Sequence, residues 1–157
     1  MYDAGMFHVV LFEPEIPPNT GNIIRLCANT GCFLHLIHPL GFTLEDKRMR
    51  RAGLDYHEYA HITHHPHFEA FCATVDFGTI YPISTKGHVA YTDVSFLEGD
   101  VLLLGSESKG LPEAVRAAHR DQVLYIPQRP HSRSLNLANA AAVVVYEAWR
   151  QHDFATS

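Results

Sequence analysis

An apolar run in the second half of the sequence constrains the fold more than any other stretch. Residues 100–105 read DVLLLG, so four consecutive apolar side chains follow Asp100 and end at a glycine. A strand that is apolar at every position is buried on both faces, which is typical of a parallel sheet covered by helices. Because segments that favour strands and helices alternate along the chain, we expect a single α/β domain with a mostly parallel sheet flanked by helices.

The remaining elements are expected from apolar runs, helix caps and glycines. Besides DVLLLG, strands are expected in MFHVVLFEP, CFLHLIHP, FGTIYPIST and QVLYIP. Helices are expected in a segment capped by Asn19 or Thr20 and ended by Gly31, in LEDKRMRRAG up to Gly53, in HPHFEAFCATV, in LPEAVRAAH with Pro112 in its first turn, and from about Leu135 to His152. We expect residues 1–5 to be an extension and residues 6–157 to be the domain.

The last expected helix carries information about assembly. Its sequence LNLANAAAVVVYEAW is apolar almost all the way round, so it lacks an obvious solvent face. One side can pack on the sheet and the other on a second subunit. We therefore expect a homodimer with Val143 and Tyr146 at the interface. A central helix in a monomer is the alternative, and it is harder to arrange at the end of a chain.

Composition narrows the class of protein. The chain has 157 residues, of which 46% are hydrophobic and 18% charged, as in an ordinary soluble globular domain. No apolar run approaches the ~20 residues of a membrane-spanning helix, and no basic stretch precedes the first apolar segment as in a secretory signal. Cys27, Cys32 and Cys72 lack CxxC spacing, which favours reduced thiols. We expect a cytoplasmic protein with no membrane partner.

The charge distribution leaves two interpretations open. The net charge of −5 argues against a general nucleic-acid binder and against DNA as a partner. However, KRMRR places Lys47, Arg48, Arg50 and Arg51 within five positions. Such a run is either a solvated face or a local basic patch in an otherwise acidic chain.

A glycine loop follows the apolar strand. Gly105 and Gly110 are spaced as in a phosphate-binding loop, but that motif continues with Lys and Ser or Thr, whereas Leu111 and Pro112 follow here. Glu107 would also repel phosphate. The loop lies between a strand and a helix, where open α/β sheets bind ligands. It suits a neutral or cationic ligand, unless the glycines serve only the geometry of the turn.

Two further segments carry polar residues that could bind a ligand. In NTGNIIR, Arg25 is flanked by apolar residues on its helix face, so it either grips a phosphate or forms a surface salt bridge. In IPQRPHSRSLNLANAA, Ser134 and Asn136 lie between a strand and a helix N-terminus. They either help to cradle a ligand or, in the case of Ser134, simply cap the helix.

A histidine cluster, His61, His64, His65 and His67, occurs in HITHHPH. Imidazoles bind zinc, so a metal site is conceivable. No carboxylate or cysteine ligand pattern accompanies the cluster, and a polar surface loop accounts for it. We expect no metal.

Taken in order, three of these segments resemble the motifs of a known family. NTGNIIR, LLLGSESKGLP and IPQRPHSRSLNLANAAAVVVYE resemble the three motifs of the SPOUT methyltransferases, and the resemblance extends over about residues 6–152. EPEIPPNTGNIIRLCANTG and DKRMRRAGLDYHE resemble the short members that methylate the ribose 2′-hydroxyl of cytidine or uridine 34 in tRNA. The resemblance implies a C-terminal trefoil knot and an S-adenosylmethionine pocket lined by Ile83, Gly105, Ile126 and Ser134.

The resemblance also implies roles for the polar residues. Arg25 would act on the ribose hydroxyl and could serve the cofactor of the other subunit of a homodimer, with Glu107 and Asn136 as polar supports and no metal. The partner would be the anticodon stem-loop of tRNA, foremost leucine tRNAs, with KRMRR contacting its phosphates. Two alternatives stay open: a related enzyme acting on another tRNA position or on ribosomal RNA, and a non-catalytic RNA-binding module.

Overall fold

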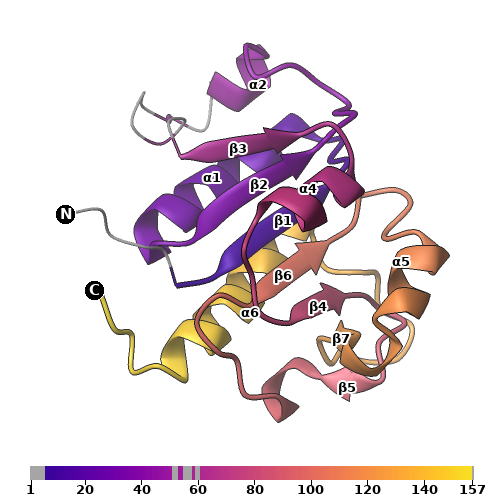
Figure 1. The fold of residues 1–157 in the computed structure, drawn as a ribbon. Coiled ribbons are helices and arrows are strands. Elements are labelled where there is room, and N and C mark those ends of the chain that lie inside the picture. Colours follow the sequence, from indigo (N-terminus) through magenta and orange to yellow (C-terminus); the bar gives the residue numbers. More distant parts are fainter. Residues whose placement is uncertain (1–5, 51–52, 55–57, 59–60, 157) are drawn as a thin grey trace.

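The chain forms a parallel sheet with helices on both faces in the computed structural model (Figure 1), which describes residues 6–50, 53–54, 58 and 61–156, with only the backbone at 49 and 50. The strands are β1 (His8–Phe12), β2 (Phe33–Ile37), β3 (Ile62–His65), β4 (Ile80–Ile83), β5 (Val89–Ala90), β6 (Val101–Leu104) and β7 (Leu124–Tyr125). The helices are α1 (Pro17–Thr30), α2 (Lys47–Arg50), α4 (Phe68–Thr74), α5 (Glu113–Ala118) and α6 (Leu137–Arg150), with short 3-10 turns at Tyr91–Asp93 and Arg120–Gln122.

The strand order is β3-β2-β1-β6-β4-β7-β5, and all neighbouring strands among the described residues run parallel. This confirms the predicted α/β sheet. The chain moves outward from β1 through β2 to β3, crosses to β4, and returns to place β6 beside β1. In open α/β sheets, such a change of direction leaves a crevice at the carboxyl ends of the strands.

The central strands are buried on both faces, as their sequence predicts. In β6, Leu102 and Leu104 pack in the core beneath α1 and α6, whereas Val101 and Leu103 pack in the core beneath α4. The alternation follows from the two-residue period of a strand. Figure 1 shows α1 and α6 behind the sheet, with α4 and α5 in front. Burying each of these side chains contributes about 1.5–3 kcal/mol.

Helix α1 begins earlier than predicted. Its N-cap is Ile16, which makes no side-chain cap, and Pro17 and Pro18 occupy the first turn. The prediction that Asn19 or Thr20 caps the helix is therefore wrong. Proline has no backbone N–H to satisfy and is favoured at the first helical position, so this start needs no capping side chain. Gly31 ends the helix as predicted.

Helix α6 begins two residues later than predicted. Its N-cap is Asn136, whose Oδ1 accepts from Ala138 N at 2.9 Å and from Asn139 N at 3.3 Å. The suggested cap at Ser134 is therefore wrong. Asparagine is among the strongest N-cap residues, which accounts for the start of the helix at Leu137.

The sequence-based prediction missed two strands. HITHHPH was expected to be a polar loop, but Ile62–His65 forms the edge strand β3 beside β2. An edge strand tolerates polar side chains, so it lacks the apolar signal of a central one. The two-residue strand β5 is too short to show any period. No helix within the described part of the chain has both the length and the apolar character needed to cross a membrane.

Candidate functional site

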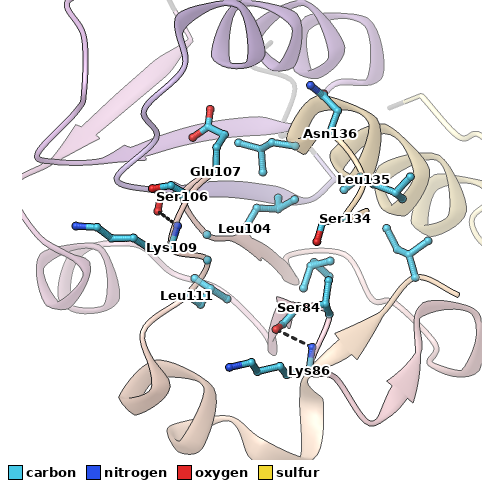
Figure 2. Close-up of a pocket in the computed structure, with 18 of the residues that line it drawn as sticks. Ser84, Lys86, Leu104, Ser106, Glu107, Lys109, Leu111, Ser134, Leu135 and Asn136 are labelled. Atoms are coloured by element: carbon cyan, nitrogen blue, oxygen red, sulfur yellow. Dashed lines mark hydrogen bonds between the residues drawn. The ribbon is translucent and has the colours of Figure 1, made fainter. Parts of the chain in front are cut away.

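A cavity of roughly 490 Å³ opens at the carboxyl ends of β4, β6 and β7 (Figure 2). Its walls come from the ends of these strands and the loops that follow them, and from the start of α1 and of α6. The volume lies within the ~300–1,000 Å³ of small-molecule sites. The crevice expected from the strand order is therefore present.

The cavity is lined by both apolar and polar residues. Eight lining residues are aliphatic: Ile16, Ile83, Leu104, Leu111, Ile126, Leu135, Leu137 and Ala140. The cations Lys86, Lys109 and Arg116 and the hydroxyl of Ser134 also belong to the lining. Such a site suits a partly apolar small molecule, and the cations among the lining residues favour one that carries an anionic group.

The glycine loop closes tightly on itself. A Cβ at Gly105 would lie 2.2 Å from the carbonyl carbon of Gly110 and 2.3 Å from the nitrogen of Leu111. Gly110 N donates to the Ser106 carbonyl at 2.9 Å, and the Ser106 hydroxyl accepts from Lys109 N at 3.3 Å (Figure 2). Gly105 therefore permits backbone-to-backbone contact, which shapes the loop as a wall of the cavity.

Glu107 joins this loop to the segment before α1. Its Oε1 accepts from Glu15 N at 2.8 Å, and its Oε2 accepts from Ile16 N at 3.0 Å and from Asn19 Nδ2 at 3.1 Å. The carboxylate of Glu15 in turn accepts from Ser108 N and Oγ at 2.8 and 2.7 Å, and these bonds lower the pKa of Glu15. Glu107 thus binds donors at the N-terminus of α1.

Asn19 and Asn136 complete the connection between the three sequence motifs. Asn136 Nδ2 donates to Asn19 Oδ1 at 2.9 Å, while Asn19 Nδ2 donates to Glu107. Each motif therefore contributes one member to a continuous hydrogen-bonded chain beside the cavity. Sequence reasoning missed Asn19 as a site residue and considered it only as a cap, because its partners lie 88 and 117 positions away.

The four residues expected to contact the cofactor lie together. Ile83, Gly105, Ile126 and Ser134 all line the cavity, although they come from three different strand ends and a loop. Figure 2 shows Ser134 between Leu104 and Leu135. Glu107 and Asn136 line the same cavity.

Arg25 lies elsewhere. The described residues that line the cavity do not include it. Its Nη2 donates to the Gly53 carbonyl at 2.7 Å, and its Nε donates to the carboxylate of Glu58. Since Arg25 follows Asn19 by six residues, it lies about 9 Å further along the helix axis. Within one subunit, the structure therefore separates Arg25 from Glu107 and Asn136.

The basic cluster is described only in part. Lys47 and Arg48 are exposed on α2, and Arg48 Nη2 lies 3.2 Å from the carboxylate of Asp46. The hydrogen bond from Arg48 to Asp46 raises the pKa of the guanidinium. The side chain of Arg50, and Arg51 as a whole, lie outside the described residues.

The histidine cluster is not simply a polar surface loop. His65 is buried, and its Nε2 lies 2.9 Å from Nδ1 of His35, whose Nε2 lies 2.9 Å from Nδ1 of His8. His67 caps α4 by accepting from Ala70 N. No group of three or more His, Cys, Asp or Glu within the described ranges is arranged to hold a metal ion.

The outer face of α6 leaves apolar surface uncovered. Val143 is half-buried and Tyr146 is 44% exposed, whereas Ala141, Val144, Val145 and Ala148 are buried. The helix is therefore covered on one side by its own chain, and its other side presents an aromatic ring to solvent.

The chain is similar to a known family and to proteins of known activity. The pattern of the SpoU rRNA Methylase family matches residues 6–146. A tRNA (cytidine(34)-2′-O)-methyltransferase of Methylovorus glucosotrophus is 56% identical over 154 residues, covering 96% of this chain and 98% of that protein.

Two solved structures share the fold. One, reported as structural insights into the 2-OH methylation of C/U34 on tRNA, has a TM-score of 0.88 at 45% identity, covering 96% of this chain and 98% of that one. The other is the SpoU methyltransferase AviRb of Streptomyces viridochromogenes in complex with AdoMet. Its TM-score is 0.78 at 27% identity, covering 98% of this chain and 60% of that one.

Proposed function

Since this chain belongs to the SpoU rRNA Methylase family, we propose that it is a tRNA (cytidine/uridine-34-2′-O)-methyltransferase that uses S-adenosylmethionine. The observation that carries the proposal is the match over nearly the full length to an enzyme of that activity. The cavity framed by all three motifs gives the activity a site. The enzyme acts in the cytoplasm, and leucine tRNAs are its foremost substrates.

The residues that line the cavity fit the cofactor. Apolar walls at Ile83, Leu104 and Ile126 suit an adenine ring, and Lys86 or Lys109 in the lining suits a carboxylate. Gly105 and Ser134 would approach the cofactor from the two loops. When bound, S-adenosylmethionine supplies a methyl group activated by a sulfonium. No metal is required for such a transfer.

The chain's polar residues would position the acceptor ribose. Guanidinium stays charged in proteins, so Arg25 is a poor proton acceptor. It is suited to gripping the phosphate beside nucleotide 34 and to stabilising negative charge that develops on the 2′-oxygen. Asn136 and Glu107 act as supports that hold the two loops of the cavity against α1.

A homodimer would bring Arg25 to a cavity. Arg25 lies outside the described lining of the cavity of its own chain. In the proposed dimer it serves the cavity of the second copy. Apolar surface supports the assembly: Ile16, Leu135 and Tyr146 are 44%, 40% and 44% exposed. They belong to the start of α1, the segment before α6 and α6 itself, and these two helices pack together on one face of the sheet (Figure 1).

The RNA contact would extend from the cavity to the basic cluster. The anticodon stem-loop carries regularly spaced phosphates, and Lys47 and Arg48 are exposed on α2. Arg50 and Arg51 belong to the same proposed contact. A local patch suffices for an enzyme that releases its product after each turnover.

The proposed enzyme also has a C-terminal trefoil knot. Backbone contacts bring the loop after β4 against β7, since Ser84 N donates to the Leu124 carbonyl at 2.9 Å and His88 N donates to the Val123 carbonyl at 3.1 Å. The knot is tested by pulling the two ends of the chain apart and measuring its fully extended length. A knotted chain should be shorter than an unknotted chain of the same number of residues, because some residues stay trapped in the knot. An equal length would contradict the knot.

The activity is tested on leucine tRNA transcripts with cytidine or uridine at position 34, in the presence of a metal chelator. Nuclease digestion and mass spectrometry should find one 2′-O-methylated nucleoside at position 34. The same tRNA with a 2′-deoxyribose at position 34 should stay unmethylated there. Methylation only at another tRNA position, only in ribosomal RNA, or nowhere despite cofactor binding would reject the proposal in favour of the corresponding alternative.

A further inference from the structure

Among the residues that the structure describes, two groups from the segment that follows α2 accept hydrogen bonds from Arg25. Its Nε donates to Oε2 of Glu58, and its Nη2 donates to the carbonyl of Gly53 at 2.7 Å. The Glu58 side chain is only 13% exposed, whereas that of Arg25 is 42% exposed. The more buried carboxylate therefore anchors the more exposed guanidinium.

Two acceptors at different points of a planar group fix its orientation as well as its position. The guanidinium presents its N–H donors in one rigid plane. A carboxylate at Nε and a carbonyl at Nη2 together prevent that plane from rotating about the end of the side chain. An arginine held in this way approaches a phosphate with its geometry already set, which lowers the entropic cost of reaching a reactive arrangement.

The same segment continues from the basic helix. Gly53 lies three residues after the last residue of α2, and α2 packs beside α1, which carries Arg25. Lys47 and Arg48, which we propose to contact RNA, therefore precede both acceptors closely in the sequence.

We propose that Glu58 is a positioning residue for methyl transfer. It holds the guanidinium of Arg25, together with the Gly53 carbonyl, in the orientation in which it meets the substrate. This inference rests on the proposed function, because it assigns Glu58 to the same site. Glu58 acts through Arg25 and is not itself a catalytic residue.

The test compares steady-state kinetics of the full-length enzyme with position-34 tRNA for Glu58→Ala, Glu58→Gln and a matched control, Glu98→Gln. Glu58→Ala should lower kcat about 10- to 100-fold, since a small misplacement of a positioned group has effects of that size. KM for tRNA and for S-adenosylmethionine should change little. Glu58→Gln keeps an oxygen acceptor of the same shape and should recover part of kcat. Glu98 is exposed in the segment before β6, so its variant should match the wild type.

A double-mutant cycle separates positioning from a structural role. In an Arg25→Ala background, Glu58→Ala should produce no further loss of kcat, because the group that it positions is already absent. A full additional loss there would overturn the inference. So would an unchanged kcat in Glu58→Ala, or a raised kcat, which would make the ion pair an inhibitory contact. Wild-type enzyme that fails to methylate position 34 would instead reject the proposed function, and with it the inference.

Discussion

The side-chain amide of Asn136 donates a 2.9 Å hydrogen bond to the side-chain carbonyl of Asn19, a residue 117 positions earlier in the chain. Asn136 also caps α6 through its Oδ1, and Asn19 also donates to Glu107. One asparagine therefore stabilises a helix start and joins the last motif of the chain to the first.

The two tasks of Asn136 can be separated by substitution. Asn136→Ser keeps a capping oxygen and loses the bond to Asn19, so its free energy of unfolding should fall by about 0.5–1.5 kcal/mol. Asn136→Ala loses the cap as well, which costs a further ~1 kcal/mol. Urea denaturation measures both. Equal losses in the two variants would show that the cap contributes nothing.

The closure of the glycine loop predicts a sharp difference between its two glycines. In Gly105→Ala, the new methyl would meet the backbone of Gly110 and Leu111 at 2.2–2.3 Å, so the loop must open and calorimetry should find S-adenosylmethionine binding weakened at least about tenfold. Gly110 has a φ of +65° but open space around it. Gly110→Ala should therefore cost about 1–2 kcal/mol of stability through strain alone. Unchanged cofactor binding in Gly105→Ala would contradict the assignment of this loop to the site.

Three buried imidazoles predict loss of stability in mild acid. Burial, with the neighbouring His8 and His65, lowers the pKa of His35 to about 3, and burial also lowers the pKa of His8 and His65. An unfolded histidine has a pKa of about 6.5. The unfolded chain therefore binds more protons than the folded chain at any pH between these values. The resulting stabilisation is complete above pH 6.5 and is lost as the pH falls toward 3.

The free energy of unfolding should fall by up to about 1.4 kcal/mol per pH unit for His35 alone. Urea denaturation between pH 7.5 and 5 measures this slope. His35→Gln should reduce the slope. Because desolvation is not screened by ions, the wild-type slope should persist at higher salt; a slope abolished by salt would point to surface charges instead.

The basic cluster predicts a salt-dependent effect on RNA binding. Arg48→Ala should reduce the slope of log K for tRNA against log salt concentration by about 0.7–0.9, because one fewer phosphate is neutralised. S-adenosylmethionine binding should stay unchanged. Arg150→Ala is the matched control, since Arg150 is similarly exposed and also pairs with a carboxylate, that of Glu147. An unaltered slope in Arg48→Ala would show that Arg48 belongs to a solvated face and does not contact RNA.

The uncovered ring on α6 predicts the state of assembly. The wild type should sediment as a dimer, and Tyr146→Glu should shift it toward the monomer, because the charge would be buried in an apolar interface. Ala114→Glu introduces the same charge on the exposed surface of α5, across the sheet (Figure 1), and should leave the dimer intact. A wild-type monomer at micromolar concentration would rule out the shared site.

Local sequence patterns alone determined the central architecture. The apolar run of β6 requires cover on both faces, and Gly31 stops α1, because burial and backbone sterics act within a few residues. The loop between Gly105 and Gly110 was recognisable for the same reason. The resemblance of these segments to a known family also assigned Ile83, Ile126 and Ser134 to the same pocket as that loop.

Tertiary structure alone decided which distant side chains meet. The sequence predicted Asn19 as a helix cap, but in the folded chain Asn19 contacts Glu107 and Asn136. No sequence pattern indicated that Arg25 pairs with Glu58. His65 belonged to a polar run, yet β3 pairs with β2 and buries its ring beside His35. Each of these contacts joins residues at least 30 positions apart, so it depends on how the strands are ordered, and no pattern within a single segment encodes that order.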